Sequence, residues 1–212
     1  MATFDFKKDR KDLYAPPTTG FVLVDVPPMT FLAIDGHGDP NTSAAYREAV
    51  EALYAASYAV KFAGKAQGRD IVVGPLEGLW SAADPGAFTS RAKADWDWTM
   101  MIRQPDWATA DMLRETIAAT ARKKSLPALE AMRVFPYAEG TCLQIMYIGA
   151  YDGEAPTLAR LHNEVMPAQG LTWNGPHHEI YLGDPRRVAP EKLKTILRQP
   201  VRPANPEPAG VA

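Results

Sequence analysis

β-branched and aromatic residues dominate two early segments, FVLVDV (21–26) and TFLAIDG (30–36), a pattern that predicts two strands. Asp39 and Pro40 follow, and an N-cap residue before a proline predicts the start of a helix. Apolar residues then recur at steps of three and four, which predicts one amphipathic helix that runs to about Gly64. The residues of this apolar stripe are Tyr46, Ala49, Val50, Leu53, Tyr54 and Ser57.

The next segments predict two more strands and then a repetition of the same order. DIVVGPLEGLW (70–80) and DWDWTMMIRQ (95–104) predict an antiparallel pair, separated by a turn-rich loop over 81–94. An amphipathic helix is predicted over 108–124 and a short one over 126–131. A strand (TCLQIMYIGAYDGE), a helix with His162 on its apolar side, and a strand (HHEIYLGD) follow. APEKLKTILRQP (189–200) predicts either a short helix or a mixture of helix and strand.

This order predicts an α+β fold of two tandem strand–helix–strand–strand modules, which form an antiparallel sheet with a central ligand groove. The modules cover about 18–105 and 132–202, and a helical connection covers 106–131. Residues 1–17 are expected to be an extension that docks on the body, and 203–212 a flexible tail. A groove between similar modules is a usual place for a small-molecule site.

Composition limits the classes of partner. The chain has 212 residues, 46% of them hydrophobic and 23% charged, which is typical of a globular protein. A net charge of −2 gives no reason to expect nucleic acid or an anionic membrane as partner. No signal peptide and no membrane-spanning run is recognisable, so we expect a cytoplasmic protein, either a monomer or a homodimer.

The sequence offers little metal or cofactor chemistry. Cys142 is the only cysteine, which excludes an intrachain disulfide, and its apolar neighbours predict a buried thiol. The four histidines lack the spacing of a metal site, and GHGDPN lacks the GK[ST] of a phosphate loop. We therefore expect neither a metal nor a cofactor.

Three of the five tryptophans lie within 96–107, and strand alternation places Trp96 and Trp98 on one face. Two interpretations stay open. The indoles pack in the core beneath a helix, or they form a wall on which a flat ligand stacks, because two adjacent indoles are bulky for a thin core layer. Trp80 on the neighbouring strand, and Tyr147 and Tyr151 from the second module, could extend such a wall.

In HHEIYL, His177, Glu179 and Tyr181 share one strand face, and Ile180 lies on the other. If the apolar face meets a helix, Glu179 and Tyr181 line the groove, where partial desolvation would raise the pKa of the carboxyl group toward the range of a general base. The alternative is a solvated glutamate on an exposed edge strand. Glu77 in PLEGLW is a second candidate carboxylate, on a face that the pattern does not assign.

PLEGLW, DWDWTMMIRQP and HHEIYLGDPRRVAPEKLKTILRQP resemble the GyrI-like small-molecule-binding family, in particular its stand-alone branch that includes cyclopropanoid cyclopropyl hydrolases. The resemblance covers about 18–202. It implies a pair of SHS2-type modules with an aromatic cage and an acidic residue in the groove between them. Carried onto this chain, the implied ligand-binding residues are Trp80, Trp98, Tyr147 and Trp173, and the implied catalytic residues are Glu179 and Tyr181. Glu77 is a further expected ligand-binding residue, from its place in the first module.

The resemblance also implies a function. The protein would bind flat hydrophobic xenobiotics and hydrolyse the cyclopropane ring of DNA alkylators of the yatakemycin type, for cellular protection. Glu179 would position or deprotonate a water, and Tyr181 would donate a hydrogen bond to the oxyanion that develops. The alternative is a drug-sequestering protein with the same pocket and no turnover. Direct gene regulation is not expected, because the sequence shows no helix-turn-helix region.

Overall fold

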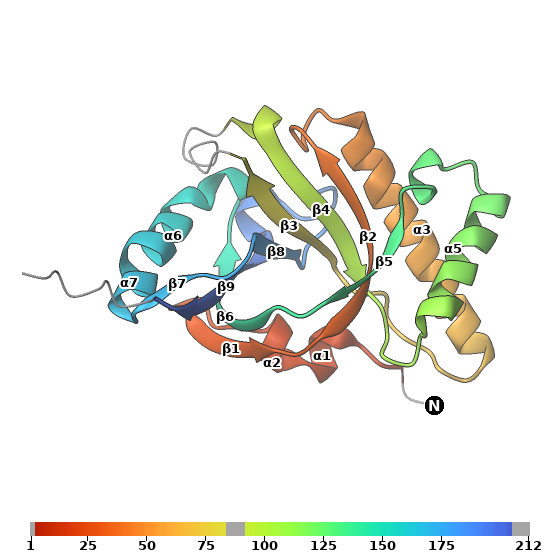
Figure 1. Ribbon diagram of the computed structural model, residues 1–212, viewed down its shortest axis with the longest axis horizontal. Helices are drawn as coiled ribbons and strands as arrows, with labels where there is room; N and C mark the ends of the chain where they lie inside the picture. The colour runs from red at the N-terminus through yellow and green to blue at the C-terminus, as the bar shows by residue number, and fades with distance from the viewer. Residues whose placement is uncertain (1–2, 84–91, 205–212) are drawn as a thin grey trace, which may run out of the picture.

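The computed structural model describes residues 3–83 and 92–204, which form one mixed α+β body around a large sheet (Figure 1). The strands of the described part are β1 (Val22–Val26), β2 (Met29–His37), β3 (Leu76–Ala82), β4 (Trp96–Arg103), β5 (Arg133–Tyr137), β6 (Gly140–Ile148), β7 (Leu171–Trp173), β8 (His177–Tyr181) and β9 (Lys194–Pro203). The α-helices are α1 (Phe6–Asp9), α2 (Lys11–Tyr14), α3 (Ala44–Ala66), α5 (Ala110–Lys123), α6 (Ala155–Arg160) and α7 (Met166–Ala168), with a π-helical turn at Leu161–Val165. The predicted α+β class is confirmed.

The sheet order is β1-β6-β9-β8-β3-β4-β2-β5, with antiparallel neighbours throughout, and β7 adds to the end of β9. The first half contributes β2, β4 and β3, and the second contributes β6, β9 and β8 in the mirrored order, so the predicted duplication is confirmed. The halves join where β3 pairs with β8, from Leu76 opposite Tyr181 to Trp80 opposite His177. Gly78 and Glu179 lie opposite each other at the middle of this junction.

The two outer strands are exchanged between the halves. β1 precedes β2 in the chain but pairs with β6 of the second half. Conversely, β5 precedes β6 but pairs with β2 of the first half. Each half therefore completes its sheet with a strand that leads into the other half.

Strand alternation gives the sheet two different faces. The face that packs against α3, called here the helix face, carries Trp80, Trp98, Met100 and Ile102 in one buried cluster with Leu53 of α3. The opposite face, called here the N-terminal face, is covered by α1 and α2 and carries a second cluster. Its buried members include Phe6, Leu13, Tyr14, Leu79, Met101, Ile180 and Ile196. Phe6, Leu13 and Tyr14, from the predicted N-terminal extension, thus form part of the core.

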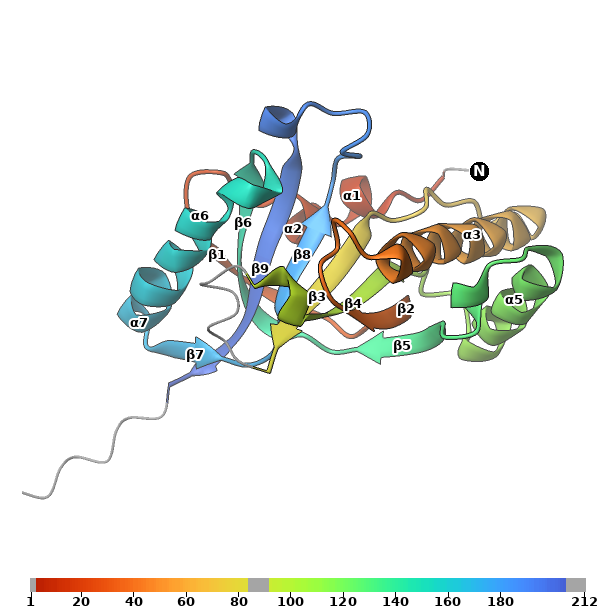
Figure 2. The ribbon, with the colours of Figure 1, turned by 90° about the horizontal axis from the view of Figure 1, so that it is seen from above.

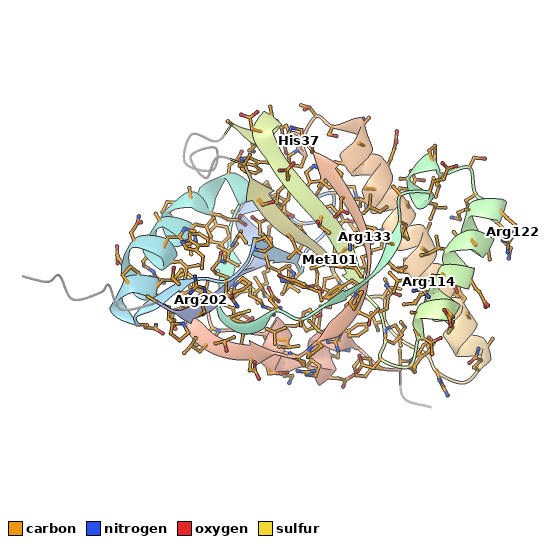
Figure 3. The ribbon with its side chains drawn as sticks, viewed as in Figure 1. His37, Met101, Arg114, Arg122, Arg133 and Arg202 are labelled. Carbon is orange, nitrogen blue, oxygen red and sulfur yellow. The ribbon has the colours of Figure 1, made fainter. Side chains whose placement is uncertain are left out.

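The helices are grouped by half. α3 and α5 lie beside the first half of the sheet, and α6 and α7 beside the second (Figure 2). Arg114 and Arg122 of α5 project away from the sheet, whereas Met101 lies within it (Figure 3). None of the helices in the described ranges is both long and apolar enough to cross a membrane.

Three predicted boundaries need correction or comment. α3 begins at Ala44 rather than after Asp39, because the Ser43 side chain caps it by accepting a hydrogen bond from the Tyr46 amide. Asp39 instead stabilises the preceding turn by accepting from the Asn41 amide. Residues 189–200 follow the mixed alternative: a 3₁₀ turn at Pro190–Lys192 precedes β9. The predicted loop at 81–94 and tail at 203–212 lie partly outside the described residues.

Candidate functional site

A cavity with a volume of about 1880 Å³ opens on the helix face, where the two halves of the sheet meet. It is larger than the roughly 300–1,000 Å³ typical of a small-molecule pocket, and it extends along the outside of α3. Aromatic side chains from both halves form its inner wall, and two carboxyl groups lie among them. These residues are Tyr46, Tyr54, Trp80, Trp96, Tyr151 and Tyr181, with Glu154 and Glu179. The arrangement suits a ligand with an apolar body and at least one polar group.

A line of hydrogen bonds crosses the junction of the halves inside this cavity. The indole N–H of Trp80 donates to the Tyr181 hydroxyl at 3.0 Å, and that hydroxyl donates to Glu179 Oε2 at 2.8 Å. Burial raises the pKa of Glu179 to about 7, against the opposing effect of the Tyr181 hydrogen bond. Burial also raises the pKa of Tyr181 well above its usual range, so its hydroxyl keeps its proton. Glu179 can therefore exchange a proton near neutral pH while its orientation stays fixed.

Gly78 makes room for this line. A Cβ at this position would lie 3.0 Å from Trp80 Nε1 and 3.1 Å from Met100 Sδ, closer than side chains normally approach. Without a side chain at Gly78, the Trp80 indole can lie across β3 and point its N–H toward the neighbouring strand.

Glu154 is the second carboxyl group of the inner wall, and it is not among the residues that the sequence pattern predicted for the site. It lies between the 3₁₀ turn Tyr151–Gly153 and the first residue of α6, and only 4% of its surface is exposed. Burial, and then the negative charge of Glu179, raise the pKa of Glu154 to about 9. Its Oε1 has no hydrogen-bond partner among the described residues. At neutral pH the site therefore combines a protonated Glu154 with a Glu179 close to its midpoint, which is the pairing that acid–base catalysis requires.

The sequence signal for Glu154 was its position. It ends the segment IGAYDGE, immediately before Ala155 and Pro156, whose proline marks a helix start. In a duplicated fold, a helix start after an inner strand points back toward the groove. The helix start at Ala155 and Pro156 is therefore the sequence feature that indicates this carboxyl group.

The two tryptophans of β4 have different positions relative to the cavity. Trp98 is 2% exposed and lies behind the cavity wall, edge-on to Tyr46 at 5.3 Å and flat against the backbone of Gly36, where a Cβ would overlap the indole. Its position supports the packing interpretation. Trp96 lines the cavity and lies edge-on to Trp80 at 5.6 Å. One strand face thus supplies both a core residue and a wall residue, because the helix covers only part of it.

Tyr147 and Trp173 do not line the cavity. The Tyr147 ring packs against the glycines at 149 and 153, and its hydroxyl donates to the Ala150 carbonyl at 3.1 Å. Trp173 lies on β7 with 47% of its surface exposed and packs on His162, at 4.1 Å between ring centres. Tyr151, which the sequence analysis named beside Tyr147, is the tyrosine of this region that reaches the cavity.

Glu77 lies on the N-terminal face, so the expectation that it lines the groove needs correction. In the register of β3 and β8, Gly78 rather than Glu77 corresponds to Glu179, and a one-residue difference moves a side chain to the other face. Glu77 Oε1 accepts a hydrogen bond from Tyr14 at 3.1 Å, and Oε2 forms an ion pair with His178 at 3.0 Å. Its position makes it part of the buried polar contacts that hold α2.

Metal ligands are not grouped in this structure. Over residues 3–83 and 92–204, no three His, Cys, Asp or Glu side chains are placed to hold a metal ion together. The inner wall supplies carboxyl groups, phenols and indoles, and basic side chains such as Lys93 also line the cavity.

A duplicated antiparallel sheet with an aromatic, carboxyl-bearing cavity at its centre is the architecture of a small-molecule-binding protein. Residues 21–202 match the GyrI-like small molecule binding domain, and the chain belongs to this family. No curated protein was found to be significantly similar to the chain.

Solved structures extend the comparison. A hydrolase from Listeria innocua is 38% identical with a TM-score of 0.83, over 95% of this chain and 100% of that one. A second protein from Listeria innocua, described only as a conserved protein, is 37% identical with a TM-score of 0.86, over 94% and 100% of the two chains. The EcmrR C-terminal domain, at 9% identity and a TM-score of 0.57, covers 87% of this chain and 98% of its own and shares the fold alone.

Proposed function

We propose that this protein binds flat hydrophobic xenobiotics in the aromatic cavity and hydrolyses the cyclopropane ring of cyclopropanoid DNA alkylators of the yatakemycin type. The role would be protection of the cell from such compounds. Support comes from the hydrolase of Listeria innocua that shares more than a third of its residues with this chain, and from the resemblance of the β3, β4 and β8 segments to the stand-alone GyrI-like branch that includes cyclopropyl hydrolases.

The observation that carries the proposal is the partly buried Glu179 carboxylate, held by Tyr181 beside aromatic walls. A flat polycycle would stack on Trp80 and Trp96, which places its strained ring near the carboxylate. In the reaction, a water oxygen bonds to the strained methylene carbon as the ring C–C bond breaks. The electron pair of that bond moves through the conjugated ring to the carbonyl oxygen, which becomes a phenolate. Glu179 takes the proton that the water loses.

The phenolate must gain a proton, and Glu154 is suited to supply it. The Tyr181 hydroxyl hydrogen is already directed at Glu179, so Tyr181 acts first by orienting that carboxylate. Glu154 is protonated at neutral pH because its pKa is raised to about 9. Proton transfer from Glu154 to the phenolate balances the proton that Glu179 gains, and the net change is addition of one water. Strain in the substrate provides much of the driving force, so the site needs no covalent nucleophile.

Product counting tests the proposal. The protein is mixed with an excess of a cyclopropanoid alkylator, and ring-opened product is measured by liquid chromatography. Many products per protein are expected. Glu179→Gln should lower kcat about 100-fold or more, the usual size of a general-base contribution, while ligand binding measured by tryptophan fluorescence stays nearly unchanged.

Two results would contradict the assignment. Protection that stops at one equivalent of alkylator would favour a drug-sequestering protein with the same pocket. Full turnover by the Glu179→Gln variant would remove Glu179 as the base. Glu191→Gln is a matched control, because Glu191 is an exposed residue of the turn before β9 and lies outside the cavity.

A further inference from the structure

The outer side of α3 carries an apolar patch that the described chain leaves uncovered. Tyr58 and Phe62 are 47% and 61% exposed, and their ring centres are 6.3 Å apart. Together with Glu51, Ala55 and Lys65 they follow alternating steps of four and three residues, so all five lie along one stripe of the helix. This set of five residues is called here the outer stripe. Two large aromatic side chains facing solvent on one helix indicate a contact surface.

A groove of small side chains runs beside the outer stripe. Ala59 and Ala63 of α3 and Thr116 and Ala119 of α5 line its walls, which belong to the extension of the large cavity along α3. Small residues let another helix approach closely, and an adjacent aromatic side chain could fill the space they leave. The surface therefore presents both a projection, Phe62, and a depression.

The charges at the two ends of the outer stripe are opposite. Glu51 lies toward the start of α3 and Lys65 near its end, equally spaced in sequence on either side of Tyr58. Neither forms an ion pair with another residue of the described chain, although the charge of Lys65 also lowers the pKa of Asp70, the partner of neighbouring Lys61. Such a surface is complementary to a second copy of itself related by a two-fold axis.

We propose that α3 packs antiparallel against α3 of a second copy of this chain, about a two-fold axis near Tyr58. In such a contact, residue i meets residue j and residue j meets residue i. Glu51 then faces Lys65 of the second copy, and Lys65 faces its Glu51. Phe62 lies against Ala55 of the second copy, and Tyr58 lies near the axis. The proposal does not depend on the chemistry of the inner wall, because none of the outer-stripe residues belongs to that wall.

The contact would also change the cavity. Ala55, Tyr58 and Phe62 line its outer extension, so the second copy would cover that part and leave the inner site between Trp80 and Glu179. A cavity that is unusually large in one chain would thereby be reduced toward the size of a ligand.

Sedimentation equilibrium of the full chain at 1–100 µM (roughly the range in which modest interfaces dissociate) tests the proposal. The wild type should be a dimer. Glu51→Lys and Lys65→Glu should each raise the dimer dissociation constant tenfold or more, because each sets like charges opposite each other twice. The double variant Glu51→Lys/Lys65→Glu should return to within about threefold of the wild type, since it restores opposite pairs. Phe62→Glu should dissociate the dimer.

Leu23→Glu is the matched control: it places the same charge on a residue that is 55% exposed on β1, away from α3. It should leave the dimer intact. Circular dichroism shows that each variant is folded. A monomeric wild type at 100 µM would overturn the proposal, as would a dimer that resists the single reversals or a double variant that stays monomeric.

Discussion

Gly78 is the residue on which the geometry of the inner site depends. It faces Glu179 across the junction of the two halves, and a side chain at this position would come within 3.0 Å of the Trp80 indole nitrogen. The aromatic wall and the candidate base are therefore linked through one backbone position.

Gly78→Ala should disturb the site without changing any polar group. The added Cβ would push the Trp80 indole by a few tenths of an ångström, weaken its 3.0 Å bond to Tyr181 and loosen Glu179. We expect ligand affinity to fall about tenfold, corresponding to ~1.4 kcal/mol, measured by fluorescence titration. Gly20→Ala, where no atom lies within 4 Å of the added Cβ, should bind as the wild type does. Equal affinity in the two variants would show that Trp80 does not need its present orientation.

The Glu154→Gln variant should be more stable than the wild type and less active. The folded-state pKa of Glu154 is raised to about 9 from the usual 4.5, so the folded protein holds a proton that the unfolded chain releases. The free energy of unfolding therefore falls as pH rises from 4.5 through 9, and Gln removes this loss. At pH 8 we expect a Tm higher by about 3 °C or more, the shift that ~1 kcal/mol produces in a domain of this size.

The same pair of groups sets the pH profile of the proposed turnover. kcat should rise as Glu179 ionises near pH 7 and fall as Glu154 loses its proton near pH 9. The falling side should disappear in Glu154→Gln, whose remaining activity is low. A Glu154→Gln variant with unchanged Tm at pH 8 and unchanged kcat would contradict both the buried proton and the role as acid.

At this scale, strand alternation predicted that Glu179 and Tyr181 share one face, and the structure brings them together with Trp80, whose face the pattern did not assign. Alternation could not predict how far a helix covers a face, so it could not show that Trp98 is buried in the core while Trp96 lines the cavity. It also could not locate Glu154, which lies in a turn where no periodicity operates.

Among the elements, α1 and α2 are the ones that the sequence describes least well. Their polar pattern predicts only an extension that docks on the body, yet Phe6, Leu13 and Tyr14 are buried in the N-terminal face. Short helices carry too few turns for a periodic signal, and their burial depends on a sheet built from distant segments.

A buried network attaches α2 to the sheet. His178 lies between Glu77 and Glu139, at 3.0 and 2.9 Å, and Arg198 contacts Glu139 at 3.3 Å. Arg198 also donates to the Leu13 carbonyl at 2.7 Å. Burial alone would lower the pKa of His178, but the two glutamates outweigh it and raise the value to about 9. The imidazolium thus holds together strands from both halves and the end of α2.

His178→Ala should lower the free energy of unfolding by about 3–5 kcal/mol, because it leaves buried carboxylates without their partner. Since the folded-state pKa of His178 lies above its usual 6.5, the stabilisation is complete below pH 6.5 and lost as pH rises through about 9. Urea unfolding at pH 6 and pH 9.5 measures both. The free energy of unfolding of the variant should be much lower than that of the wild type at pH 6, and the difference should be smaller at pH 9.5. A constant difference at the two values would mean that packing, rather than charge, accounts for the effect.

Over the whole molecule, the sequence predicted the duplication because the order of elements repeats, and the MMIRQP and TILRQP segments occupy equivalent strands, β4 and β9. The exchange of β1 and β5 could not be predicted. Hydrophobic periodicity shows that a segment is a strand and which side is apolar, but it contains nothing about which neighbour completes its hydrogen bonds.

That exchange has a consequence for how the molecule could be divided. A cut in the connection at 106–131 would give two fragments. The first would keep β1, which pairs with β6 of the second, and would lack β5. The second would keep β5, which pairs with β2 of the first, and would lack β1. In either fragment alone, the strand at the junction and the outermost strand would each expose unpaired backbone amide and carbonyl groups. Exposed strand edges of this kind promote aggregation. Each half therefore depends on the other for its outer strand, and we expect the two halves to fold as a single cooperative unit.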